Sequence, residues 1–176
     1  NWTLENFVAQ DGPYLKIDTK GTTLTFADTG GIVPKMTSNV LPSGTASSTL
    51  AGASAYTMFS QINGQWFNTG GTSSLLNIAY DLPGATTAVV DAYSVQAPAI
   101  VDGAPELPPA WVLEGFDGTN WIVLDTRSGQ QALGGEYKQN QIENTTAYQS
   151  YQVRGTAAGT YAGSAASGFG QISFHR

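Results

Sequence analysis

A short segment rich in side-chain amides and aromatic rings is the clearest chemical signal in the sequence. Residues 61–71 contain two Gln, two Asn, a Trp and a Phe, and glycines bound the segment. Proteins bind sugars by placing an aromatic ring on the C–H face of the sugar and directing amides, carboxylates or guanidinium groups at its hydroxyls. We therefore predict ligand contacts from Asn63, Gln65, Trp66 and Asn68. The alternative for Trp66 is burial in the core, in which case the neighbouring amides carry the binding.

Three further side chains are candidates for the same chemistry. Phe116 stands at the tip of a turn, where an exposed ring suggests contact with a sugar or packing against a partner. Tyr161 flanks a loop rich in Gly, Ala and Ser, and is either a ligand or a packing residue. Arg127 either reaches the ligand or forms an ion pair with Asp125.

Several function classes are excluded by what the chain lacks. Its 176 residues include no Cys and one His, His175, so thiolate chemistry and multi-histidine metal sites are absent. The net charge of −6 argues against nucleic acid and against a basic membrane contact. No run of residues is apolar enough to insert into a membrane. The scattered Asp and Glu residues suggest no carboxylate pair, so the sequence predicts no enzyme.

The elements that must position these residues are β-strands. Short runs rich in β-branched and aromatic residues recur between Gly, Pro, Asn and Asp, and no long stretch has a helical period. This pattern predicts an all-β sandwich or barrel. The expected strands are Tyr14–Asp18, Thr22–Ala27, Leu76–Leu82, Ala88–Val95, Trp111–Phe116, Asn120–Asp125, Tyr148–Arg154 and Gly170–Phe174.

The best-defined unit is a hairpin over Trp111–Asp125. Two apolar segments flank Asp117-Gly118, a pair typical of tight turns because glycine adopts positive φ at little cost. Apolar residues occupy both faces of the segments, which indicates a strand buried between layers. We therefore expect Trp111 and Trp121 in the core and Asp117 as a turn former.

The same hairpin resembles the central motif of the discoidin family, also called the coagulation factor V/VIII type C domain, which is galactose-binding-like. The family motif has the form Trp-x-Leu-Glu-Gly-Ser-Asn-Asp-Gly-x-x-Trp-x-x-Leu-Asp. Here the turn is one residue shorter and Phe116 replaces a small polar residue. Weaker matches follow the family order at Asn77–Leu82, Val90–Val95, Tyr148–Val153 and Ser167–Phe174.

The resemblance covers residues 32–176 and implies a jelly-roll sandwich whose loops bind a ligand without catalysis. Residues 1–31 are expected to form an additional β element or the end of a preceding module. Many family members hold a structural calcium through an Asp and a Glu. Here Ser60 and Gln171 stand at those positions, so we expect no bound cofactor, with calcium held by carbonyl and amide oxygens as the alternative.

The opening of the domain, with Val33–Asn39 and Ser54–Tyr56, is similar to versions found in phage tail and bacterial surface proteins. The expected partner is therefore a carbohydrate on a cell surface, and the expected location is a virion tail or the bacterial exterior. The alternative is a structural module that packs against neighbouring domains of a tail or fibre, or against further copies of itself.

Overall fold

A computed structural model describes 31–49, 54–61, 67–68, 76–98, 107–130, 132, 135–157, 160–161, 164–165 and 168–176. For 67–68, 160–161 and 164–165 only the backbone is described. The expected N-terminal element falls outside these residues, apart from residue 31. So do the predicted strands Tyr14–Asp18 and Thr22–Ala27.

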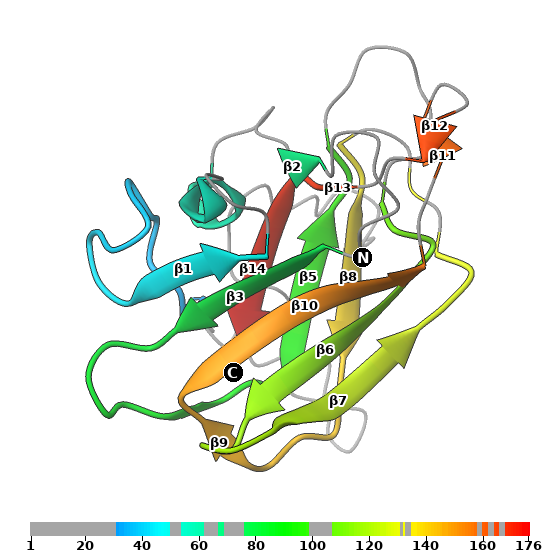
Figure 1. Cartoon of the computed structure of the whole chain (residues 1–176). Helices are drawn as coiled ribbons and strands as arrows, with labels where there is room; N and C mark the ends of the chain where they lie inside the picture. Colours follow the sequence, from blue (N-terminus) through cyan, green and yellow to red (C-terminus); the bar gives the residue numbers. More distant parts are fainter. Residues whose placement is uncertain are drawn as a thin grey trace, which may run out of the picture.

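A five-stranded antiparallel sheet forms one layer of the molecule and faces the viewer in Figure 1. Its spatial order is β1 (Thr45–Ser48), β3 (Asn77–Asp81), β10 (Ser150–Ala157), β6 (Ala110–Phe116) and β7 (Trp121–Arg127). Strands far apart in the sequence are therefore neighbours, because β10 lies between β3 and β6.

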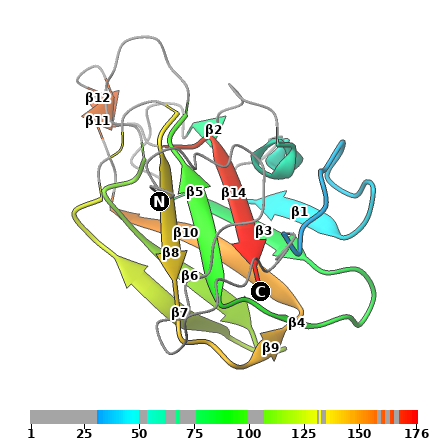
Figure 2. The same ribbon diagram turned by 180° about the vertical axis from the view of Figure 1, so that it is seen from behind.

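A three-stranded antiparallel sheet forms the second layer and faces the viewer in Figure 2. Its order is β14 (Gln171–His175), β5 (Ala92–Gln96) and β8 (Tyr137–Gln141). Short antiparallel pairs join β2 (Phe67–Asn68) to β13 (Gly168–Phe169), β4 (Ala88–Val89) to β9 (Ala147–Tyr148), and β11 (Thr160–Tyr161) to β12 (Ser164–Ala165). The helical element η1, a 3₁₀ turn, covers Ala55–Phe59. No helix among the described residues is long and apolar enough to cross a membrane.

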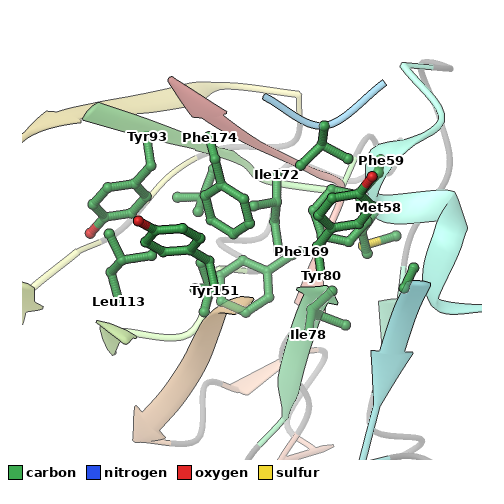
Figure 3. Close-up of a cluster of buried hydrophobic side chains, with 14 of the residues drawn as sticks. Met58, Phe59, Ile78, Tyr80, Tyr93, Leu113, Tyr151, Phe169, Ile172 and Phe174 are labelled. Atoms are coloured by element: carbon green, nitrogen blue, oxygen red, sulfur yellow. The ribbon is translucent and has the colours of Figure 1, made fainter. Parts of the chain in front are cut away.

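The core lies between the two sheets, because alternate residues of each strand point inward. Figure 3 shows inward side chains of both sheets and of η1 packed together. The ring of Tyr151 packs 5.7 Å from that of Phe174, which belongs to the opposite sheet, with the ring planes inclined at 43°. The largest fully buried side chains include Trp111, Tyr80, Tyr93, Tyr151, Phe169 and Phe174. The predicted all-β jelly-roll sandwich is confirmed.

The predicted hairpin is also confirmed, with its turn built from Asp117. The Asp117 Oδ1 atom accepts hydrogen bonds from the backbone N–H groups of Thr119 at 2.8 Å and Asn120 at 2.7 Å. Gly118 adopts φ of 97°, which explains the need for glycine. These bonds favour the ionised carboxylate and hold the pKa of Asp117 below its usual value.

The expectation that Trp121 is buried is wrong. Trp111 has no exposed surface, whereas Trp121 is 37% exposed and Val123 is 52% exposed. The reason lies in the register: β7 is the last strand of the five-stranded sheet, and its pairing with β6 places Trp121 beside Phe116 on the outer face, away from the three-stranded sheet. Trp111 points inward, where its indole N–H donates to Tyr93 of the second sheet. The apolar residues on both faces of the second hairpin segment thus belong to an edge strand and not to a central one.

Candidate functional site

The predicted ligand loop is only partly described. Asn63, Gln65 and Trp66 lie outside the described residues, so their placement stays a prediction. Asn68 lies on β2 and Tyr161 lies on β11, and for both residues only the backbone is described. In Figures 1 and 2 these two short strands lie at the same end of the sandwich, the upper end in both views. The structure therefore brings the backbones of Asn68 and Tyr161 to one end of the fold.

Arg127 lies at the end of β7, opposite Trp111 on β6. Its Nε atom donates to Asp125 Oδ2 at 2.7 Å, so the predicted ion-pair alternative is the one observed. The hydrogen bond to Asp125 raises the pKa of Arg127, which stays cationic. About a third of the Arg127 side chain, 32%, remains exposed. Arg127 thus presents a fixed, partly accessible guanidinium.

A buried hydrogen-bond chain holds this ion pair against the second sheet. The Tyr93 hydroxyl donates to Asp125 Oδ2 at 2.7 Å and accepts from Trp111 Nε1 at 2.9 Å. Burial is the main cause that raises the pKa of Tyr93 far above its usual value, and the hydrogen bond to Asp125 adds to it. Tyr93 therefore remains protonated and acts as a donor to the carboxylate.

A β-bulge explains how Asp125 reaches Tyr93. Glu114 pairs with Val123 and Leu113 pairs with Asp125, so Leu124 is an additional residue in β7. Strict alternation would put Asp125 on the same face as Trp121 and Val123. The bulge instead turns Asp125 to the inner face, where it meets the Tyr93 hydroxyl.

Phe116 lies at the other end of β6, directly opposite Trp121. Five residue steps separate it from Trp111, the partner of Arg127, which corresponds to about 17 Å along the strand. Phe116 and Arg127 are therefore too far apart to contact one sugar ring. Phe116 is half-buried, and its ring centroid lies 5.2 Å from that of Trp121. The sequence suggested an exposed ring at Phe116, but the more exposed ring of the pair is Trp121.

The outer face of the five-stranded sheet carries a polar cluster that sequence reasoning missed. Glu114 is 3% exposed and accepts from Arg154 Nη2 at 2.5 Å, Arg154 Nε at 3.0 Å and Gln152 Nε2 at 2.7 Å. Asn77 Nδ2 donates in turn to Gln152 Oε1 at 3.0 Å. These residues come from three strands, and only the pairing register of the strands brings them together. Their spacing in the sequence therefore does not predict the cluster.

The calcium positions of the resembled family do not have the family's chemistry here. Ser60 is buried and donates its hydroxyl to the carbonyl of Thr57 at 2.8 Å. Gln171 is buried at the start of β14. Among the residues that the structure describes, no three His, Cys, Asp or Glu side chains gather as a metal site. The donor set therefore does not fit a carboxylate-bound calcium.

No protein-family model and no curated protein matches this chain. Solved structures do match it. A family 32 carbohydrate-binding module of Clostridium perfringens NanJ in complex with galactose is 8% identical with a TM-score of 0.56, covering 76% of this chain and 93% of that one. This chain has the fold of that module. The resemblance at the level of fold to galactose-binding-like domains is thereby confirmed.

Two further structures extend the comparison. CpGH89CBM32-5 from Clostridium perfringens, in complex with GalNAc-β-1,3-galactose, is 10% identical with a TM-score of 0.59, covering 76% of this chain and 95% of that one. Chitosan-binding module 1 of a chitosanase/glucanase from Paenibacillus sp. IK-5 is 14% identical with a TM-score of 0.60, covering 83% of this chain and 98% of that one. At such low identities the shared property is the fold.

Proposed function

We propose that this chain is a non-catalytic carbohydrate-binding module. The observation that carries the proposal is the likeness over three quarters of the chain to modules solved with galactose or GalNAc-β-1,3-galactose. The second support is the run of amides and aromatic rings in residues 61–71. In this proposal Asn63, Gln65 and Asn68 bind sugar hydroxyls, and Trp66 or Tyr161 supplies the stacking ring.

The setting that we propose is the surface of a bacterium or a phage tail, where the module recognises a cell-surface or capsular polysaccharide. A single shallow site binds a sugar weakly, so copies joined in one assembly would gain affinity through avidity. The low content of charged residues, 11%, suits neutral hydroxyl-rich ligands.

Isothermal titration against galactose and GalNAc-β-1,3-galactose, together with a glycan array, tests the proposal. The Asn63→Ala/Gln65→Ala double variant should bind at least tenfold more weakly, since each lost hydrogen bond is worth about 1 kcal/mol. Gln139→Ala is the matched control, because it removes an exposed amide from β8. Absence of binding by the wild-type chain to any glycan would refute the proposal.

A structural interaction module is the second candidate, favoured by Val40 and Leu41. These side chains are 57% and 55% exposed on a loop held by backbone hydrogen bonds, including Thr37 N–H to Leu41 O at 2.9 Å. Such a firmly held apolar pair suits contact with a neighbouring domain or a second copy. Light scattering of the wild-type chain and of Val40→Ser/Leu41→Ser tests this function. An assembly that the double variant dissociates would support it, and a monomer at high concentration would contradict self-association.

A further inference from the structure

The outward side chains of the five-stranded sheet form rows across the strands. One row contains one residue from each of the five strands, and each residue of the row is the cross-strand partner of the next. In order across the sheet these residues are Thr45, Asp81, Ser150, Phe116 and Trp121. The neighbouring residues Tyr80 and Tyr151 point into the core, so the row faces outward. Strands lie about 4.8 Å apart, so the row is about 19 Å long. We call it the sheet-edge row: Thr45, Asp81, Ser150, Phe116 and Trp121.

The aromatic end of the sheet-edge row is firmly positioned. Trp121 packs on Phe116 with ring planes inclined at 46° and keeps 37% of its surface exposed. The strands that carry both rings are joined by the turn that Asp117 locks. A ring held in this way loses little freedom when a ligand stacks on it, which favours binding.

The centre of the sheet-edge row offers polar side chains that form no hydrogen bond with the described part of the chain. Ser150 is only 7% exposed, yet within the described residues no hydrogen bond engages its hydroxyl. The same is true, within that part of the chain, of the Asp81 carboxylate and the Thr45 hydroxyl. Buried hydroxyls in native proteins are nearly always hydrogen-bonded. A ligand that brings hydroxyl groups to this row would supply the missing partners.

Charge and area limit what the ligand can be. Asp81 is the one charged residue of the sheet-edge row, and the chain carries a net charge of −6, so an anionic ligand is disfavoured. On this face Trp121 and Val123 are 37% and 52% exposed. Together they expose on the order of 200 Å². A stable protein interface needs about 800 Å² per partner, so this apolar patch alone is too small to hold a second protein.

We infer that the sheet-edge row is a second saccharide-binding surface, which takes a linear glycan without negative charge. One sugar stacks on Trp121, and the following sugars place hydroxyls on Ser150, Asp81 and Thr45. The inference rests on the proposed sugar-binding function but uses none of the residues assigned to that site. In Figure 1 the end of β6 and the start of β7 lie at the bottom of the view, whereas β2 and β11, which carry Asn68 and Tyr161, lie at the top. Two glycan segments can therefore bind at once.

Isothermal titration with oligosaccharides of one to six units tests the inference, using neutral galacto-oligosaccharides, chitosan oligomers and acidic oligogalacturonate as probes. We expect affinity for a neutral or amino-sugar probe to rise with chain length. Trp121→Ala should weaken binding of the longer oligomers about tenfold. Ser150→Ala, a second variant with little change in volume, should weaken it about fivefold. Val123→Ala is the matched control, because it removes an exposed apolar side chain from the next row of the same strand.

The outcomes separate this inference from the proposed function. Loss of binding in Asn63→Ala/Gln65→Ala but not in Trp121→Ala or Ser150→Ala would overturn the inference and leave the proposed function intact. A wild-type chain that binds no probe would overturn both. Preferential binding of oligogalacturonate, or a dimer that Trp121→Ala dissociates with no change in sugar binding, would also overturn the inference.

Discussion

Removing the Tyr93 hydroxyl should destabilise the fold strongly, although it changes a single atom. In Tyr93→Phe, the Asp125 carboxylate loses a 2.7 Å hydrogen bond and the Trp111 indole N–H loses its 2.9 Å acceptor. Trp111 has no exposed surface, so water cannot replace the acceptor. A hydrogen bond to a charged group is worth about 1.5–3 kcal/mol, and an unsatisfied buried donor costs about 1–3 kcal/mol. Because the Tyr93 hydroxyl serves both groups, we expect a loss of about 3 kcal/mol in the free energy of unfolding.

Urea denaturation followed by tryptophan fluorescence measures this loss, and calorimetry should show the melting temperature fall by about 6–12 °C. Tyr56→Phe is the matched control: Tyr56 packs against the core, and its hydroxyl forms no hydrogen bond among the described residues. Its unfolding free energy should change by less than about 0.5 kcal/mol. A loss below about 1 kcal/mol in Tyr93→Phe would refute the reasoning, because it would mean that the shared hydroxyl is not the sole partner of the buried indole.

Three further changes test other parts of the structure. Gly115→Ala should lower the free energy of unfolding by about 1–3 kcal/mol in urea denaturation, since the added Cβ would lie 2.6 Å from the Tyr148 ring. Gly155→Ala is the control and should lower it clearly less, because its added Cβ would lie 3.4 Å from the nearest atom. Equal losses in the two variants would contradict the packing argument. Asp117→Ala should destabilise the hairpin at neutral pH. The folded state lowers the pKa of Asp117, so the ionised carboxylate stabilises the fold at pH values above its unfolded pKa of 3.8. This stabilisation disappears as the pH falls through the folded-state pKa. The melting curves of the variant and the wild type should therefore converge in acid. Glu114→Gln should lower the free energy of unfolding by about 2 kcal/mol in urea denaturation, because Glu114 is buried while its ion-pair partner Arg154 is partly exposed. An unchanged denaturation midpoint would show that the ion pair contributes nothing to stability.

Sequence periodicity predicted most strands but not their grouping. The run Ala88–Val95 is divided between β4 and β5, which belong to different sheets. The strands β1 and β8 were not predicted, because the pattern that reveals a strand is absent from both. Within β1 only Ala46 is buried, and β8 buries only Asn140. Both strands lie at the edge of a sheet, where little apolar surface is needed.

The candidate site was less predictable than the fold, because its residues meet through register. The sequence gives no reason to associate Asp81, Ser150 and Trp121, which lie on β3, β10 and β7. Trp121 was misassigned for a related reason. Its segment is as apolar as that of Trp111, and only the strand register decides that the Trp111 ring points inward and the Trp121 ring outward.

The two halves of β7 have opposite surroundings, and the bulge at Leu124 separates them. Before the bulge, Trp121 and Val123 face outward and are exposed; after it, Asp125 is tied through Tyr93 to the second sheet. An exposed, uncharged and apolar edge is an aggregation hazard that proteins normally mask with charge. Here the pinned half fixes the strand, so the exposed half can present Trp121 without detaching from the sheet. That combination of exposure and rigidity suits the proposed sugar-binding surface, because the bulge confines the tie to the second sheet to the half of β7 that lies beyond Trp121.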